Sequence, residues 1–155
     1  KDWTMRAFTI IEMLITFLIL SLIAGAIFAS TNIAILSWDF NIGMLTLVQQ
    51  VRQAMDGMMR ESRQSKLSSV TIDTSGFRLD FSIPNASNAI SYYTLNNQLI
   101  REHPPGTTKV LANNISSLQF FLNSIVLQIQ IQGTKTIRNV PRSFSLMEEV
   151  KLRNE

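Results

Sequence analysis

The sequence predicts an α+β protein, in which a long N-terminal helix packs on a small antiparallel β-sheet. Three observations lead to this prediction. No charged residue occurs from Met13 to Trp38, apolar residues then recur at steps of three and four as far as Met59, and apolar and polar residues alternate after Leu67. A change of period from 3.6 to 2 marks a change from helix to strand.

The composition fits one small domain with an apolar appendage. The chain has 155 residues, of which 46% are hydrophobic and 16% are charged, and its net charge is +3. The absence of cysteine excludes a disulfide scaffold, a thiolate metal site and a cysteine nucleophile. Neither half carries the basic block of a nucleic-acid binder, so we do not expect nucleic acid as a partner.

The charge-free run from Met13 to Trp38 predicts a membrane span. A helix of that length would rise about 39 Å, more than the ~30 Å hydrocarbon core of a bilayer. A buried core helix is disfavoured because the remaining sequence could not surround it on every side. Lys1 and Arg6 favour a cytoplasmic N-terminus, although Asp2 weakens the bias. Since the sequence begins with lysine, we expect further leader residues before it.

A cleaved secretory signal is the competing interpretation of the same run. Ala24-Gly25-Ala26, or alternatively Ala29, would provide the small residues at a cleavage site. Against this interpretation, Glu12 lies directly beside the run, where a signal peptide carries positive charge. The helical pattern also continues beyond the cleavage site.

Residues 39–66 are predicted to continue the helix with one apolar face. No proline interrupts the chain from Phe8 to Lys66, and Gly43 and Gly57 would each weaken the helix by up to about 1 kcal/mol. We expect the apolar stripe to cover the sheet; its residues are Leu45, Val48, Val51, Met55, Met58 and Met59.

Residues 67–155 are predicted to form five to seven antiparallel strands. Two segments alternate clearly, with the apolar residues Phe77, Leu79, Phe81 and Ile83 in the first and Leu127, Ile129 and Ile131 in the second. Further strands are expected at Leu118–Leu122 and at Phe144–Leu152, the last with an irregularity at Glu148-Glu149. Turns or loops are expected at Thr74-Ser75-Gly76, Asn96-Asn97 and His103–Gly106.

The segment Ala7-Phe8-Thr9-Ile10-Ile11-Glu12-Met13-Leu14-Ile15 resembles the N-terminal processing and methylation motif of type IV pilins and pseudopilins. Phe8, Thr9, Ile11 and Glu12 match the family pattern, and Ile10 is a conservative change. Ala7 stands where the family usually has glycine. The long helix followed by a sheet also agrees with the layout of the family.

The resemblance implies a fold, a processing site and a function. A prepilin peptidase would cut between Ala7 and Phe8 and methylate the new amine, and Glu12 would align incoming subunits during assembly. The expected segments are a leader peptide (1–7), a transmembrane and filament-core helix (8–38), its amphipathic continuation (39–66) and an antiparallel β domain (67–155). The subunit would lie in the bacterial inner membrane with its C-terminal domain outside the cytoplasm, and then join a filament.

Within this family, the C-terminal part resembles the J-type minor pseudopilins of type II secretion and the W-type minor pilins. The resemblance rests on 89–99 followed by Arg101, on 111–120, on the strand in which Gln128, Gln130 and Gln132 alternate with apolar residues, and on 150–154. It implies partners among other pseudopilins or minor pilins, the prepilin peptidase and inner-membrane lipid. A minor subunit of a type IV pilus or competence pilus is the first alternative.

Other residues give little indication of a catalytic or ligand site. His103 is the only histidine and lies beside two prolines, which disfavours a triad or a histidine metal site. Glu148 and Glu149 lack the neighbouring oxygen ligands that calcium needs. Of Tyr92 and Tyr93, we expect one in the core, because neighbours in a strand point to opposite faces.

The sequence therefore predicts a structural filament subunit without catalytic residues, cofactor, metal or small-molecule substrate. A signal-cleaved or membrane-anchored extracytoplasmic binding domain is the second alternative, and an enzyme is the third. The sequence does not distinguish a secretion system from a pilus or a competence system.

Overall fold

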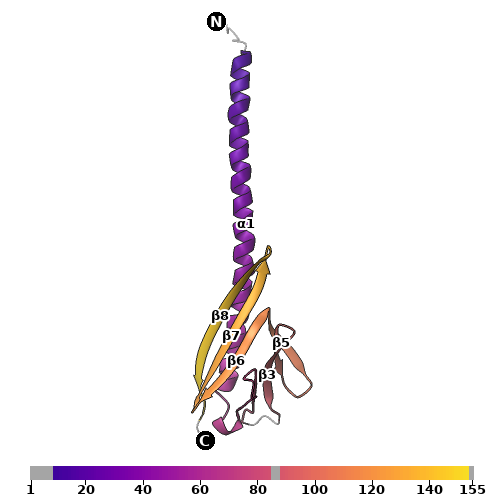
Figure 1. Cartoon of the computed structure of the whole chain (residues 1–155), viewed down its shortest axis with the longest axis vertical. Helices are drawn as coiled ribbons and strands as arrows, with labels where there is room; N and C mark the ends of the chain where they lie inside the picture. Colours follow the sequence, from indigo (N-terminus) through magenta and orange to yellow (C-terminus); the bar gives the residue numbers. More distant parts are fainter. Residues whose placement is uncertain (1–8, 85–87, 154–155) are drawn as a thin grey trace, which may run out of the picture. The chain divides into compact units, whose positions relative to one another are not determined.

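A computed structural model describes residues 9–84 and 88–153 and confirms the predicted α+β class (Figure 1). The chain divides into two compact units, residues 1–41 and 42–155. Ala7 and Phe8, the predicted cleavage site, lie outside the described residues. The elements are α1 (Ile10–Ser62), a 3₁₀ turn η1 (Leu67–Ser69), β1 (Thr71–Ile72), β2 (Arg78–Phe81), β3 (Ile90–Leu95), β4 (Gln98–Glu102), β5 (Thr108–Asn113), β6 (Ile115–Asn123), β7 (Val126–Ile137) and β8 (Val140–Lys151).

The helix α1 has two parts that differ in burial. Every residue from Thr9 to Ile42 is exposed, whereas the second part buries one face. The buried face follows the spacing of an amphipathic helix, with Gly43, Leu47, Val51, Ala54, Met55, Met58, Met59 and Ser62. The prediction for Leu45 was wrong: its side chain is 59% exposed, and Leu47 is buried instead. The two leucines are two positions apart and therefore lie about 200° apart around the helix.

The helix ends at Ser62, before the predicted end at Lys66. The backbone N–H of Ser65 donates to the carbonyl oxygen of Ser62 at 3.1 Å, which closes a tighter turn. Beyond it, the chain pairs with the C-terminal segment, because Leu67 N–H donates to the carbonyl oxygen of Arg153 at 3.2 Å. Contacts with a distant segment therefore replace the next helical turn.

Within the described residues, the strands form two antiparallel sheets where the sequence predicted one. The first has the order β1-β2-β3-β4-β5. Asn96 and Asn97 form the predicted β3–β4 turn with φ angles of 51° and 59°, which a two-residue hairpin requires. Leu79 and Phe81 point into the core as predicted, but Phe77 precedes β2 and is 47% exposed. The prediction for Phe77 was therefore wrong.

The second sheet has the order β6-β7-β8 in the part of the chain that is described. The apolar residues of β7 alternate as predicted, and Leu127, Ile129 and Ile131 are fully buried. The expected irregularity at Glu148-Glu149 is absent, because β7 and β8 pair without a break from Val126–Lys151 to Ile137–Val140. Register shifts occur instead in β4–β5 and at the start of β6.

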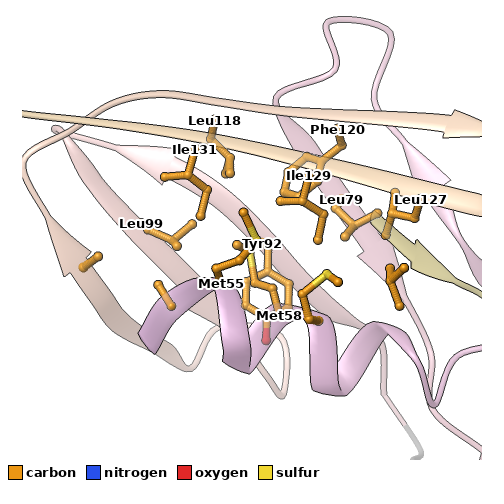
Figure 2. Packing of buried hydrophobic residues seen from close by; sticks show 14 of the residues in the cluster. Met55, Met58, Leu79, Tyr92, Leu99, Leu118, Phe120, Leu127, Ile129 and Ile131 are labelled. Carbon is orange, nitrogen blue, oxygen red and sulfur yellow. The ribbon is translucent and has the colours of Figure 1, made fainter. Parts of the chain in front are cut away.

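The core lies between the second part of α1 and both sheets. Figure 2 shows Met55 and Met58 of α1 facing side chains from each sheet, with Tyr92 in the middle. The labelled side chains from the sheets are Leu79, Tyr92, Leu99, Leu118, Phe120, Leu127, Ile129 and Ile131. The predicted role of the apolar stripe as a cover for strands is therefore confirmed.

Candidate assembly site

The first described turn of α1 contains a capping box formed by Thr9 and Glu12. The Glu12 carboxylate accepts the backbone N–H of Thr9 at 3.0 Å and its hydroxyl at 3.1 Å, and Glu12 N–H donates to the Thr9 hydroxyl at 3.3 Å. Such reciprocal bonds satisfy N–H groups that have no partner inside the helix. Glu12 therefore has a structural role within its own chain, besides any role between chains.

Among the predicted processing and assembly residues, the four that the structure describes, Thr9 to Glu12, are all exposed. Ile10 is 82% and Ile11 66% exposed, so this end of the helix makes little apolar contact within its own chain. The carboxylate of Glu12 lies immediately before the charge-free run, near the positive end of the helix dipole, which favours an anion.

After Glu12, apolar side chains surround α1 on all sides. Leu18, Ile19 and Leu20 occupy consecutive positions, about 100° apart, and are 62%, 50% and 62% exposed. A helix that is apolar all round is buried in a large core or in a membrane. Among the described residues, α1 is the one helix long and apolar enough to cross a membrane.

Several polar side chains of this apolar part bond to the helix backbone. Thr16, Ser21 and Thr31 each donate to a carbonyl oxygen three or four residues earlier, at 2.8–2.9 Å. The side-chain amide of Asn32 does the same at 3.0 Å. These donors therefore need no water, as an apolar surrounding requires.

The domain 42–155 contains a partly buried cluster of Glu61, Tyr92 and Arg101 that the sequence did not indicate. The Tyr92 hydroxyl donates to Glu61 Oε2 at 2.7 Å, and Arg101 Nε donates to both Glu61 oxygens at 3.0 and 3.1 Å. Burial, followed by the hydrogen bond to Glu61, raises the pKa of Tyr92 above its ordinary value. Glu61 is separated from its partners by 31 and 40 residues, so no local pattern could reveal the contact.

This group stabilises the fold and offers no catalytic pair. A depression of about 270 Å³ lies beside it, and Arg60 and Lys109 are among its lining residues. The Glu61 carboxylate is neutralised by Arg101, and the Tyr92 hydroxyl is held by the same carboxylate. The contacts join the last turn of α1 to β3 and β4.

The other residues that the sequence analysis considered as ligands or binding groups do not form a common site in the described residues. Tyr92 is buried and Tyr93 is partly exposed beneath the Arg78 guanidinium, which confirms that one of the two tyrosines is in the core. Glu148 and Glu149 lie on opposite faces of β8, and Glu149 accepts a hydrogen bond from Gln128 at 3.1 Å. No three His, Cys, Asp or Glu residues gather as a metal site in the described ranges.

Comparison with known proteins gave no match. No family model, no curated protein and no solved structure matched the chain. The long apolar helix and the antiparallel sheets are compatible with a pilin-like fold.

Proposed function

We propose that this chain is a minor pilin-like structural subunit of a type II secretion pseudopilus. One observation carries the proposal: α1 continues from a part that is apolar on all sides into a part that buries one face in its own domain. The N-terminal motif that resembles the prepilin family precedes the apolar part directly. A structural subunit needs both parts, one to join other subunits and one to carry a folded domain.

The exposed apolar part of α1, before Gly43, needs a surrounding of lipid or protein instead of water. Contiguous apolar surfaces of this extent are rare on soluble monomers and mark membrane or protein contacts. Lipid of the inner membrane would cover the part before assembly, and the helices of other pseudopilins or minor pilins would cover it in the filament. Both surroundings suit polar side chains that bond to their own backbone.

In this mechanism the chain itself performs no chemistry. The prepilin peptidase would cut between Ala7 and Phe8 and methylate the new amine, and the driving energy for assembly would come from a separate ATPase. Thr9 would then directly follow the new N-terminus, and Glu12 would be the fifth residue of the mature chain. The carboxylate would then be available to a cation of a neighbouring subunit at the cost of its own capping bonds.

The mass of the mature protein tests this proposal against a secretory signal. Protein extracted from membranes should begin at Phe8 and carry one methyl group, as intact-mass analysis would reveal. A mature chain beginning at Ile27 or Ser30 would overturn the proposal and favour a signal-cleaved binding domain. The continuity of α1 through these positions supports the first outcome.

Co-purification tests the assembly step. Cross-linked membranes should contain this chain together with other pseudopilins or minor pilins, and the genes beside its own should encode a secretion channel. Neighbouring genes for pilus retraction or for competence would instead assign the subunit to a type IV or competence pilus.

A further inference from the structure

The depression beside Glu61, which lies within the domain 42–155, carries an excess of positive charge. Its volume is about 270 Å³, and its lining comes from α1, β3, β4 and β5. Among its described lining residues are three cations, Arg60, Arg101 and Lys109, and one carboxylate, that of Glu61. The net charge of these four side chains is +2.

The sheet supplies two of the cations side by side. Arg101 of β4 and Lys109 of β5 are directly opposite each other in the antiparallel pair, so their side chains lie on the same face. Like charges in such positions repel each other. The Glu61 carboxylate lies 3.0 Å from Arg101 Nε and neutralises that guanidinium. Lys109 is exposed and, within the described residues, belongs to no salt bridge.

The helix supplies the third cation. Arg60 lies in the last turn of α1, directly before Glu61, and is exposed. In the ranges 9–84 and 88–153 it also belongs to no salt bridge. Two cations at the depression are therefore available to an anion from outside the chain.

The helix also presents a glycine to the depression. Gly57 lies about one turn before Arg60 and Glu61, and a Cβ on residue 57 would meet no atom within 4 Å. The packing described here therefore does not require glycine at this position, although glycine weakens a helix relative to alanine. A missing side chain allows the close approach of a ligand to the helix backbone.

The other lining residues indicate the chemistry of such a ligand. The depression is smaller than the sites of about 300–1,000 Å³ that take drug-sized molecules, so it suits a single side chain. Gln53 offers an amide donor, and Leu111 offers a partly exposed apolar wall. Cations beside an apolar wall match a carboxylate on an aliphatic stem. A phosphate ion has no apolar part to place against Leu111.

We propose that this depression binds an acidic side chain of another protein, with Arg60 and Lys109 as the cations that contact its carboxylate. Arg101 stays bonded to Glu61, and Gly57 leaves room for the stem of the incoming side chain. Each exposed ion pair raises affinity by up to about fivefold, and salt weakens it. The proposal concerns the domain 42–155 by itself and does not rest on the filament function.

Arginine side-chain NMR of the full chain in non-ionic detergent tests the proposal. With ¹⁵N-labelled arginine, the Nε–H signal of Arg60 reports on the depression, and loss of the signal in Arg60→Lys assigns it. A capped dipeptide of glutamate should shift this signal along a saturating curve, and a capped dipeptide of glutamine should not. The signal of Arg63, an exposed cation three residues later, should stay unchanged.

Variants that keep Arg60 supply the second comparison. Lys109→Gln should weaken the affinity for the glutamate dipeptide by up to about fivefold. Gly57→Gln, which adds a side chain at the depression, should abolish saturation without loss of helix, because glutamine favours a helix more than glycine does. Lys151→Gln removes one charge from β8, in the other sheet, and should bind as wild type does.

Three results would overturn the proposal. The first is an unsaturated shift, or an equal shift with the glutamine dipeptide. The second is an equal shift of the Arg63 signal, which would indicate general attraction of anions. The third is tighter binding of inorganic phosphate than of the glutamate dipeptide at equal ionic strength, which would assign the depression to phosphate. The mature mass and co-purification test the filament function separately, so either proposal can fail while the other stands.

Discussion

Gly133 of β7 lies so close to Leu47 of α1 that no side chain fits between them. A Cβ on residue 133 would be 2.8 Å from Leu47 Cδ1, 3.2 Å from Val51 Cγ2 and 3.3 Å from the carbonyl oxygen of Asn114. Such separations are below normal van der Waals contact. The missing side chain allows the strand to lie directly on the buried face of the helix.

We expect Gly133→Ala to destabilise the protein by about 1–3 kcal/mol, the usual cost of an added methyl in a packed core. The backbone oxygen of Asn114 and the branched side chain of Val51 cannot both move away. Chemical denaturation of the full chain in detergent measures the loss. A Gly133→Ala midpoint equal to that of wild type would contradict the packing described here.

Two helix glycines provide matched controls for this variant. Gly57 has open space around it, so Gly57→Ala should stabilise the helix by about 0.5–1 kcal/mol. At Gly43 an added Cβ would meet only the flexible side chain of Ile137, at 2.7 Å from Cδ1. Gly43→Ala should therefore cost less than Gly133→Ala, because side-chain movement and the better helix propensity offset the clash.

We expect Glu61→Gln to destabilise the domain by about 1.5–3 kcal/mol, because Arg101 then loses a charged hydrogen-bond partner in a largely buried position. The Arg78–Asp80 pair is the control. Its side chains are 43% and 34% exposed, and Asp80→Asn should cost about 0–1 kcal/mol. Equal losses in the two variants, measured by denaturation, would show that Glu61 has no special role.

The raised pKa of Tyr92 predicts a loss of stability at high pH. The folded state holds the phenol proton more tightly than the unfolded state, whose pKa is near 10.0. The contribution of Tyr92 is therefore complete below pH 10 and is lost as the pH rises above that value. Denaturation midpoints of wild type should fall more steeply above pH 10 than those of Tyr92→Phe; parallel curves would refute the assignment.

We expect Glu12→Gln to leave membrane insertion and cleavage intact but to impair co-purification with partner subunits. Glutamine can preserve the capping box with Thr9, so the variant removes the charge and not the cap. Thr9→Ala is the complementary variant, since it removes the hydroxyl and keeps the carboxylate. Wild-type yields of complex with Glu12→Gln would leave Glu12 with a capping role alone.

The buried face of α1 should be essential for folding of the domain. A chain that begins at Trp38 keeps Leu47, Val51 and the methionines, whereas one that begins at Leu67 loses them. Each fully buried side chain contributes about 1.5–3 kcal/mol, and the sum is comparable to the net stability of a small domain. We expect cooperative thermal unfolding, followed by circular dichroism, only for the longer chain. Equal unfolding of both would show that the sheets are stable without the helix.

Local patterns in the sequence were sufficient to predict several elements of the structure. The apolar run of α1, the Asn96-Asn97 turn and the alternation in β7 each follow from neighbouring residues, because hydropathy, a left-handed turn and the strand period are local properties. The alternation of strand residues also predicted that one of Tyr92 and Tyr93 lies in the core, and the structure shows that it is Tyr92. Function and the residues at the cleavage site stay predictions.

Other features depended on contacts between distant residues. Leu45 and Leu47 are equally apolar, and the helical spacing allows either leucine to belong to the buried face. Leu47 is the buried one, because the missing side chain of Gly133 leaves space for it. The end of α1 at Ser62 depends on pairing with Arg153, and the charged group of Glu61 depends on Tyr92 and Arg101. The sequence by itself determined which segments form helix and strand, since those choices are set by local periodicity. Only the tertiary structure decided which face is buried and which charges meet, because close packing and burial depend on residues that are far apart in the chain.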